Sequence, residues 1–233
     1  MSIGNDSNDN SRFRFFKAAK FVPNMPWTAK STWGIFEQPY ALSRTFLLSL
    51  GLILFGIGEA VLVESRLGNA PWTVLSEGVS LNSSFNIGES TVFISFIVFA
   101  IWFPLKLKPG FGTIANIFLI AIALQIGVDT ISTPDSYIAK LLMVFAGIIL
   151  VGIGSAFYIT CGLGAGPRDG LMTGLNVRTK IRVGRIRLML EVVALSLGWL
   201  LGGKVGVGTA LFGLLIGQSV AISFGVVDRL TKR

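Results

Sequence analysis

The sequence contains no histidine and only one cysteine, Cys161, among its 233 residues. The lack of histidine excludes histidine-based catalytic triads and histidine metal sites, and one cysteine cannot form an intrachain disulfide. Only 14% of the residues are charged, whereas soluble domains carry about 25%. The hydrophobic residues, 52% of the chain, gather in long apolar runs. The composition excludes a soluble enzyme, a disulfide scaffold and a disordered chain, and it predicts a polytopic membrane protein.

Six apolar stretches are long enough to cross a bilayer as helices. Each has about 17–23 residues, which covers a hydrocarbon core of ~30 Å. Because the runs are continuously apolar rather than alternating, they predict helices and not barrel strands. The six expected spans are Thr45–Val63, Ile87–Leu105, Phe111–Val128, Leu141–Ile159, Ile186–Gly202 and Val205–Val227.

The chain has a net charge of +8, and the positions of its basic residues agree with a simple membrane topology. When the chain is threaded with its N-terminus in the cytoplasm, all Lys and Arg residues except Arg66, Lys140 and Lys204 fall in cytoplasmic segments. Cytoplasmic loops of membrane proteins are enriched in Lys and Arg. This distribution predicts that both termini are cytoplasmic, and it argues against a nucleic-acid partner.

The chain matches itself without a gap at an offset of 96 residues. Gly51–Ala60 aligns with Gly147–Ala156, Leu67–Leu75 aligns with Leu163–Leu171, and the offset holds as far as Thr113. Each copy contains three spans, so the second copy must enter the membrane from the opposite side. The sequence therefore predicts two inverted three-helix repeats, an architecture found in many secondary transporters.

These patterns divide the chain into four parts. They are a cytoplasmic basic and aromatic tail (1–41), a first repeat (42–137), a second, inverted repeat (138–227) and a cytoplasmic C-terminal tail (228–233). The N-terminal tail is either disordered or lies on an anionic inner leaflet through its phenylalanines and cations.

A glycine-rich break and a proline follow the first span of each repeat. Leu67–Pro71 and Gly162–Pro167 are unfavourable inside a helix, but proline is favoured in the first turn of a new one. We therefore expect short broken or re-entrant helices at Pro71–Ser80 and Pro167–Leu175. Their N-termini offer free amides and a positive dipole end to an anionic solute. The alternative is a plain surface turn in each repeat.

Candidate substrate-binding side chains lie in and around these short helices. They are Asn69, Trp72, Thr73, Glu77, Arg168 and Asp169. Trp72 suits stacking on a ligand or anchoring at the membrane interface. Arg168 suits a carboxylate or phosphate, or is only a topology charge. Asp169 either contacts a ligand or caps its own helix.

Polar residues inside the spans are a second set of candidates, because burying them is costly and they usually face a cavity or a partner. The coupling or pathway candidates are Glu59, Gln125, Glu191 and Gln218. Arg187 stands four residues before Glu191, which favours a local ion pair. Glu59 has no such neighbour and is the candidate for proton or cation coupling. The alternative for Glu59 is an ion pair with Arg66.

Small residues four positions apart, Gly56 with Ala60 and Gly152 with Ala156, predict close helix packing. The sequence has no phosphate loop, metal-ligand cluster or nucleophile–base pair. We therefore expect no metal, no cofactor and no enzymatic activity.

The paired segments carry a family resemblance. Leu67–Leu75 and Gly162–Leu171 resemble the signature of the YczE-like bacterial integral membrane proteins, which are grouped with the YitT and YyaS proteins. Gly184–Arg187, Leu197–Gly203 and Pro109–Thr113 fit the same pattern. The resemblance runs from about residue 42 to residue 227 and implies a multi-pass protein of the bacterial inner membrane. It implies no specific activity. In many relatives an aspartate follows the Pro-Trp pair, whereas this chain has Thr73 there.

The leading hypothesis is a secondary transporter of a small polar or anionic solute, working by alternating access between the two repeats. The alternative is a non-transporting membrane scaffold or accessory protein. The expected partners are the lipid bilayer and a small-molecule solute, and a homo-oligomer is compatible with the sequence.

Overall fold

The computed structural model describes residue 23 and residues 25–231, and within these residues it contains helices and no strand. The helices are α2 (Ala41–Ser65), α3 (Pro71–Leu81), α4 (Ile87–Ala100), α5 (Trp102–Leu105), α6 (Phe111–Thr130), α7 (Tyr137–Thr160), α8 (Pro167–Thr179), α9 (Val183–Leu200) and α10 (Val207–Thr231). The all-helical prediction is confirmed for this part of the chain.

Five of the described helical stretches are long and apolar enough to cross a membrane: α2, α4 together with α5, α6, α7 and α10. The sixth predicted span, Ile186–Gly202, corresponds to α9, which is not one of the five. Its 18 residues include the charged side chains of Arg185, Arg187 and Glu191. Five of the six expected spans therefore have the length and composition of membrane helices.

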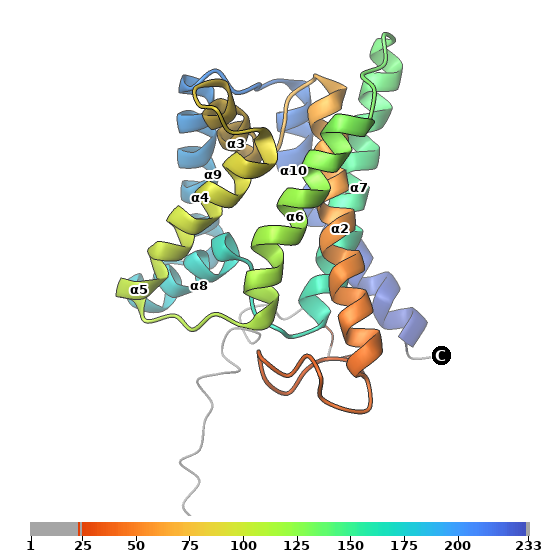
Figure 1. The fold of residues 1–233 in the computed structure, drawn as a ribbon, viewed down its shortest axis with the longest axis vertical. Helices are drawn as coiled ribbons and strands as arrows, with labels where there is room; N and C mark the ends of the chain where they lie inside the picture. Colours follow the sequence, from red (N-terminus) through yellow and green to blue (C-terminus); the bar gives the residue numbers. More distant parts are fainter. Residues whose placement is uncertain (1–22, 24, 232–233) are drawn as a thin grey trace, which may run out of the picture.

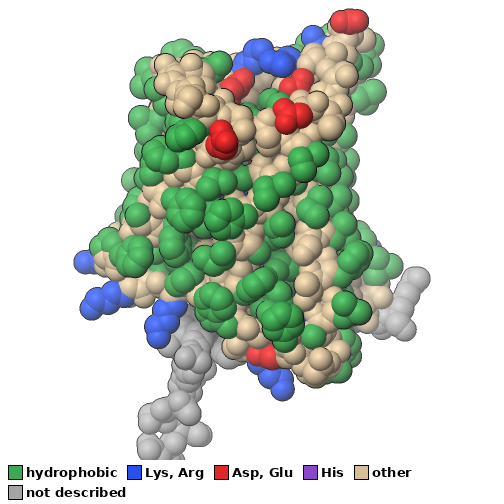
Figure 2. Space-filling model, in the orientation of Figure 1, with side chains coloured by type: hydrophobic (Ala, Val, Ile, Leu, Met, Phe, Trp, Pro, Cys, Tyr) green, Lys and Arg blue, Asp and Glu red, His purple; other side chains and the backbone are tan. Residues whose placement is uncertain are grey.

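The outer faces of these helices are apolar. The side chains of Ile122, Leu142 and Leu214 are each more than half exposed, at 53%, 64% and 72%. Figure 2 shows hydrophobic side chains covering the middle of one face, with the charged side chains gathered toward its two ends. Since exposed aliphatic surface of this extent is unfavourable in water, these faces lie in lipid, and the chain is a membrane protein.

The helices form two groups, and each group takes helices from both halves of the chain (Figure 1). In the first bundle α2 packs against α6 and α7, and α7 packs against α10. In the second bundle α3 packs against α4 and α9, and α8 packs against α4, α5 and α9. Contacts of α6 with α4 and α8 join the bundles. The two halves of the chain are therefore interlocked, and neither half forms a bundle of its own.

Four glycines allow α2 and α7 to approach closely. A Cβ added at Gly51 would lie 2.8 Å from the carbonyl oxygen of Gly154, and one at Gly58 would lie 2.9 Å from that of Gly147. Both distances are far below van der Waals contact, so any larger residue would force the two helices apart. These glycines are required where the two halves of the chain meet.

The small residues singled out in the sequence also lie at helix contacts. A Cβ added at Gly56 would lie 2.7 Å from the Cβ of Ala123 on α6, and one at Gly152 would lie 2.9 Å from the Cβ of Ser219 on α10. The predicted packing role of Gly56 and Gly152 is confirmed.

Matching backbone hydrogen bonds fasten the glycine-rich breaks. The amide of Gly112 donates to the carbonyl oxygen of Leu163 at 2.8 Å, and the amide of Gly208 donates to that of Leu67 at 2.8 Å. Donors and acceptors in the two bonds are related by the 96-residue offset. The break after α7 is thus held to the start of α6, and the break after α2 to the start of α10.

The described part of the N-terminal tail is packed against the protein. Arg44, on α2, is 3% exposed, and its guanidinium donates to the carbonyl oxygens of Trp27 at 2.6 Å and Gly34 at 2.7 Å. Residues 25–40 therefore differ from the disordered or membrane-lying tail that the composition suggested. The rest of that expectation concerns residues 1–22, which lie outside the described residues.

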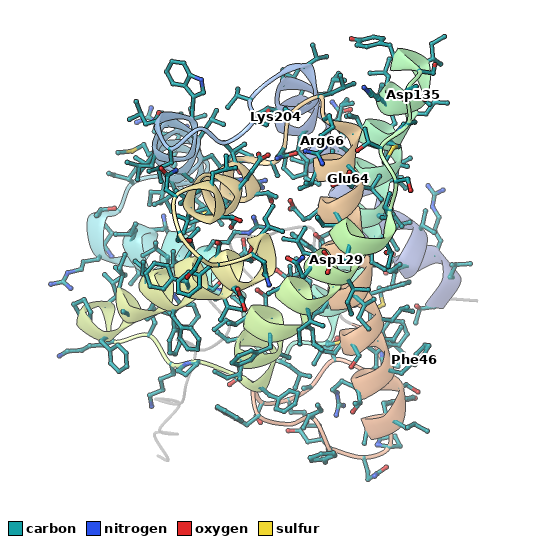
Figure 3. All side chains as sticks on the ribbon, turned by 45° about the horizontal axis from the view of Figure 1, so that its top comes forward. Phe46, Glu64, Arg66, Asp129, Asp135 and Lys204 are labelled. Atoms are coloured by element: carbon teal, nitrogen blue, oxygen red, sulfur yellow. The ribbon has the colours of Figure 1, made fainter. Side chains whose placement is uncertain are left out.

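The end of the molecule where α2 finishes carries a mixed set of charges. Figure 3 places Glu64, Arg66, Asp129, Asp135 and Lys204 at this end. The α10 helix finishes at the opposite end (Figure 1). The end where α2 finishes therefore carries both acidic and basic side chains.

Candidate functional site

Two cavities lie between the first and second bundles. The first cavity is lined by residues of α2, α3, α4, α6 and the start of α8. The second cavity is lined by residues of α2, α3, α7, α8, α9 and α10. Phe55, Trp72 and Arg168 line both. These three side chains therefore stand where the two cavities meet.

The linings of the two cavities correspond to each other at the 96-residue offset. Corresponding pairs include Phe55 with Val151, Glu59 with Ser155, Trp72 with Arg168, Thr73 with Asp169, Ser95 with Glu191 and Asn116 with Phe212. The two cavities are lined by corresponding positions of the two halves of the chain, but the side chains at those positions differ in polarity and charge. The two cavities therefore differ in what they can bind.

The short helices α3 and α8 deliver residues from their first turns to the cavities. They begin at Pro71 and Pro167, as the sequence predicts. The breaks before them contain Gly68 and Gly164, whose φ angles of +112° and +111° favour glycine. Trp102 fixes the start of α8, because its indole Nε1 donates to the carbonyl oxygen of Pro167 at 2.9 Å. Both short helices point their N-terminal ends at the space between the bundles.

Arg168 is a half-buried cation with its hydrogen-bonding capacity unused. Its guanidinium carbon lies 5.1 Å from the centre of the Phe55 ring, a cation–π contact. Among the described residues it has no hydrogen bond and no ion pair. A guanidinium has five N–H donors in a planar fork that matches carboxylates and phosphates. Arg168 is therefore available to an anionic group in either cavity.

Glu59 is 2% exposed and lines the first cavity. Its Oε2 accepts a hydrogen bond from Thr73 Oγ1, while its Oε1 is buried without a partner. The alternative ion pair with Arg66 is wrong, because the Arg66 guanidinium contacts Glu64 at 3.4 Å. A buried carboxylate oxygen without a donor costs free energy. Glu59 thus presents an unfilled acceptor to the cavity.

Asp169 faces the second cavity and is already partnered. It accepts a hydrogen bond of 2.7 Å from the hydroxyl of Tyr158, and it does not cap α8. The Tyr158 ring packs edge-on against Phe55, with centroids 6.5 Å apart. Sequence reasoning missed Tyr158, because its counterpart is Leu62 and nothing local links it to Asp169.

Glu191 and Arg187 form the ion pair that their spacing predicts. Arg187 Nε lies 2.9 Å from Glu191 Oε1, and both residues line the second cavity. This pair matches two of the charges of the second cavity within α9 itself.

Asn69 and Glu77 lie outside both cavities. The Asn69 side-chain amide donates to Glu77 Oε2 at 2.7 Å, and the backbone amide of Lys204 donates to the same oxygen at 2.8 Å. These bonds tie α3 to the loop before α10. The structure gives the two residues a structural position away from the other candidates.

Gln125 and Gln218 also lie away from the cavities. The Gln125 side chain accepts from the amide of Gly88 at 3.0 Å and donates to Asp129 at 2.7 Å, which joins α6 to the start of α4. Gln218 is exposed on α10.

Asn116, Thr91 and Ser95 line the first cavity and were missed in the sequence. Asn116 is an amide inside an otherwise apolar stretch of α6, and that isolated polarity is the signal that marks it. Within the described residues no group of three or more Cys, Asp and Glu side chains is arranged to hold a metal ion. The first cavity can bind a cationic group at Glu59 and an anionic group at Arg168.

Residues 42–224 match a family model described as a family of unknown function (DUF6198). An uncharacterized protein of Haemophilus influenzae is 40% identical over 214 residues, which cover 92% of this chain and 96% of that protein. The uncharacterized membrane protein YczE of Bacillus subtilis is 28% identical, over 80% of this chain and 87% of its own length.

The uncharacterized protein YyaS of Bacillus subtilis is 24% identical, over 77% of this chain and 92% of its own length. No solved structure matches the chain significantly. The YczE-like resemblance read from the two proline-containing segments is confirmed by these relatives. The chain therefore belongs to the DUF6198 family, a family of unknown function.

Proposed function

We propose that this protein is a secondary transporter of a small polar or anionic solute, which reaches the cavities alternately from the two sides of a membrane. One observation carries the proposal. Two cavities of matching construction meet at Phe55, Trp72 and Arg168, between two bundles of helices. Transporters built from inverted repeats bind solutes at such an interface, often beside the N-termini of broken helices.

The two repeats are inverted with respect to each other in this proposal. The matching hydrogen bonds of Gly112 to Leu163 and of Gly208 to Leu67 support it, as do the matching cavity linings. The sequence suggested that the solute pathway opens between the two repeats, whereas the structure favours an opening between the two bundles. Because the repeats interlock, we assign the opening movement to the two bundles, each of which contains helices of both repeats.

The membrane in this proposal is the bacterial inner membrane, with both termini in the cytoplasm. The distribution of Lys and Arg supports this orientation, since all of them except Arg66, Lys140 and Lys204 fall in the segments assigned to the cytoplasmic side. Arg168 binds the anionic group of the solute. Glu59 couples transport to a proton or another cation, and its unpartnered Oε1 supports that role. No covalent step is involved.

The test compares metabolites taken up or released by a deletion strain that carries the wild-type protein, Arg168→Ala or Arg185→Ala. Arg185 is exposed and lies outside both cavities, so its loss removes one nearby cation without touching the site. We expect at least one solute whose flux requires the wild-type protein and survives Arg185→Ala but not Arg168→Ala at equal membrane abundance. Equal fluxes for all three would favour the scaffold or accessory role.

A further inference from the structure

The two cavities differ in whether their charged groups are satisfied. In the second cavity Arg187 pairs with Glu191 at 2.9 Å, and Asp169 is bound by the Tyr158 hydroxyl at 2.7 Å. These groups need no ligand. In the first cavity Glu59 and Arg168 form no ion pair with any described residue, although the charge of Arg168 acts on Glu59.

Glu59 and Arg168 line the same cavity without forming an ion pair. The Oε1 of Glu59 has no hydrogen-bond partner, and the guanidinium of Arg168 lies over the Phe55 ring without donating a hydrogen bond to any described residue. A carboxylate and a guanidinium that face one buried space attract each other strongly, and each is costly to leave unpaired. A molecule that carries a hydrogen-bond donor for Glu59 and an anionic group for Arg168 would satisfy both.

The chemistry of the two groups specifies the molecule. A buried carboxylate oxygen accepts hydrogen bonds only, so it selects a donor, and a cationic ammonium is the strongest such donor. A guanidinium donates only, and its planar fork fits a carboxylate. The remaining wall is largely apolar and includes Ile94, Ile120 and Leu124. An aliphatic group of moderate size fits that wall.

We propose that the first cavity binds a zwitterionic solute of amino-acid size, with its ammonium group on Glu59, its carboxylate on Arg168 and its aliphatic part against the apolar wall. This inference rests on the proposed transport function and names the class of its solute. The second cavity does not bind the same solute, because its carboxylates are already partnered, Glu191 by Arg187 and Asp169 by Tyr158, so Arg168 is its unpaired charge.

The test measures how far added ligands raise the unfolding temperature of the purified protein in detergent, since a ligand stabilises the state that binds it. The probes are alanine, valine and leucine, each beside the amine that lacks its carboxylate and the acid that lacks its amino group. We expect one or more of the amino acids to stabilise the protein, and each matching amine or acid to need about tenfold higher concentration or more.

Three variants locate the binding, each measured against its own unliganded unfolding temperature. Glu59→Gln should abolish the preference for the amino acid over the matching acid. Arg168→Gln should abolish its preference over the matching amine. Glu191→Gln, on the wall of the second cavity, should leave both preferences unchanged.

The inference is overturned if an amine or an acid alone stabilises as well as its amino acid, if no probe stabilises the wild-type protein, or if Glu191→Gln acts like Glu59→Gln. In these cases a solute flux that still depends on Arg168 and not on Arg185 leaves the transport function standing with another class of solute. Loss of that dependence overturns transport itself.

Discussion

The hydroxyl of Thr73 on α3 donates a hydrogen bond to the carboxylate of Glu59 on α2. This bond joins the first bundle to the second at the wall of the first cavity. The corresponding residues, Ser155 and Asp169, are arranged differently: Ser155 bonds to the backbone of its own helix, and Asp169 bonds to Tyr158. Different contacts between the two bundles therefore stand at the two cavities: Thr73 with Glu59 at the first, and Asp169 with Tyr158 at the second.

Thr73→Val should lower the stability of the protein. The valine side chain keeps the shape of threonine but cannot donate, so both oxygens of Glu59 would be buried without partners, at a cost of about 1–3 kcal/mol. Thermal unfolding in detergent measures the change. Thr91→Val is the matched control, because Thr91 also lines the cavity but bonds to the carbonyl of Ile87 in its own helix at 2.9 Å. An equal loss for both variants would refute a special role for the Glu59 contact.

Gly58→Ala should destabilise the contact between α2 and α7. The added methyl group would lie 2.8 Å from a side-chain carbon of Val151 and 2.9 Å from the oxygen of Gly147, and such overpacking costs about 1–3 kcal/mol. Gly213→Ala is the control, since no heavy atom lies within 4 Å of the corresponding position. The unfolding temperature should fall for Gly58→Ala only. A comparable fall for Gly213→Ala would contradict the packing described here.

Cys161 should react very slowly with thiol reagents at neutral pH. The residue is fully buried, and burial raises the pKa of its thiol to about 12. A raised pKa keeps the thiol neutral, and only the thiolate is nucleophilic, so labelling of the folded protein should increase only as the pH rises toward that value. Rapid maleimide labelling at pH 7 would show that the α7–α8 loop opens.

If the two repeats are inverted, the two ends of the molecule should lie on opposite sides of the membrane. Single cysteines at Ser132 and Thr179, in a Cys161→Ser background, both occupy exposed positions. A membrane-impermeant thiol reagent should label Ser132→Cys in intact cells and Thr179→Cys only after permeabilisation. Labelling of both variants from the same side would be incompatible with the inversion.

Local sequence signals predicted a large part of the structure. The helices that begin at Pro71 and Pro167 follow from the conformational limits of proline and glycine. The pair of Arg187 with Glu191 follows from their spacing on one helix. In each case the physical cause lies within a few neighbouring residues.

The remainder depends on contacts between distant segments. The amide of Lys204 reaches Glu77 across 127 residues, and this bond gives Glu77 a structural position that its sequence neighbours do not reveal. The 96-residue match between the two halves likewise does not predict that helices from both halves pack together in each bundle. It arises because the glycines of α2 fit those of α7, which pairs the first helices of both repeats.

Access to the first cavity from both sides of the membrane tests the account most directly. Asn116→Cys, in the Cys161→Ser background, places a thiol on the wall of that cavity. Impermeant reagent is added from one side at a time, to intact cells and to inside-out vesicles, with Ser132→Cys and Thr179→Cys as one-sided controls. The account predicts that Asn116→Cys is labelled from both sides while each control is labelled from one. Labelling of Asn116→Cys from a single side, or from neither, would contradict alternating access.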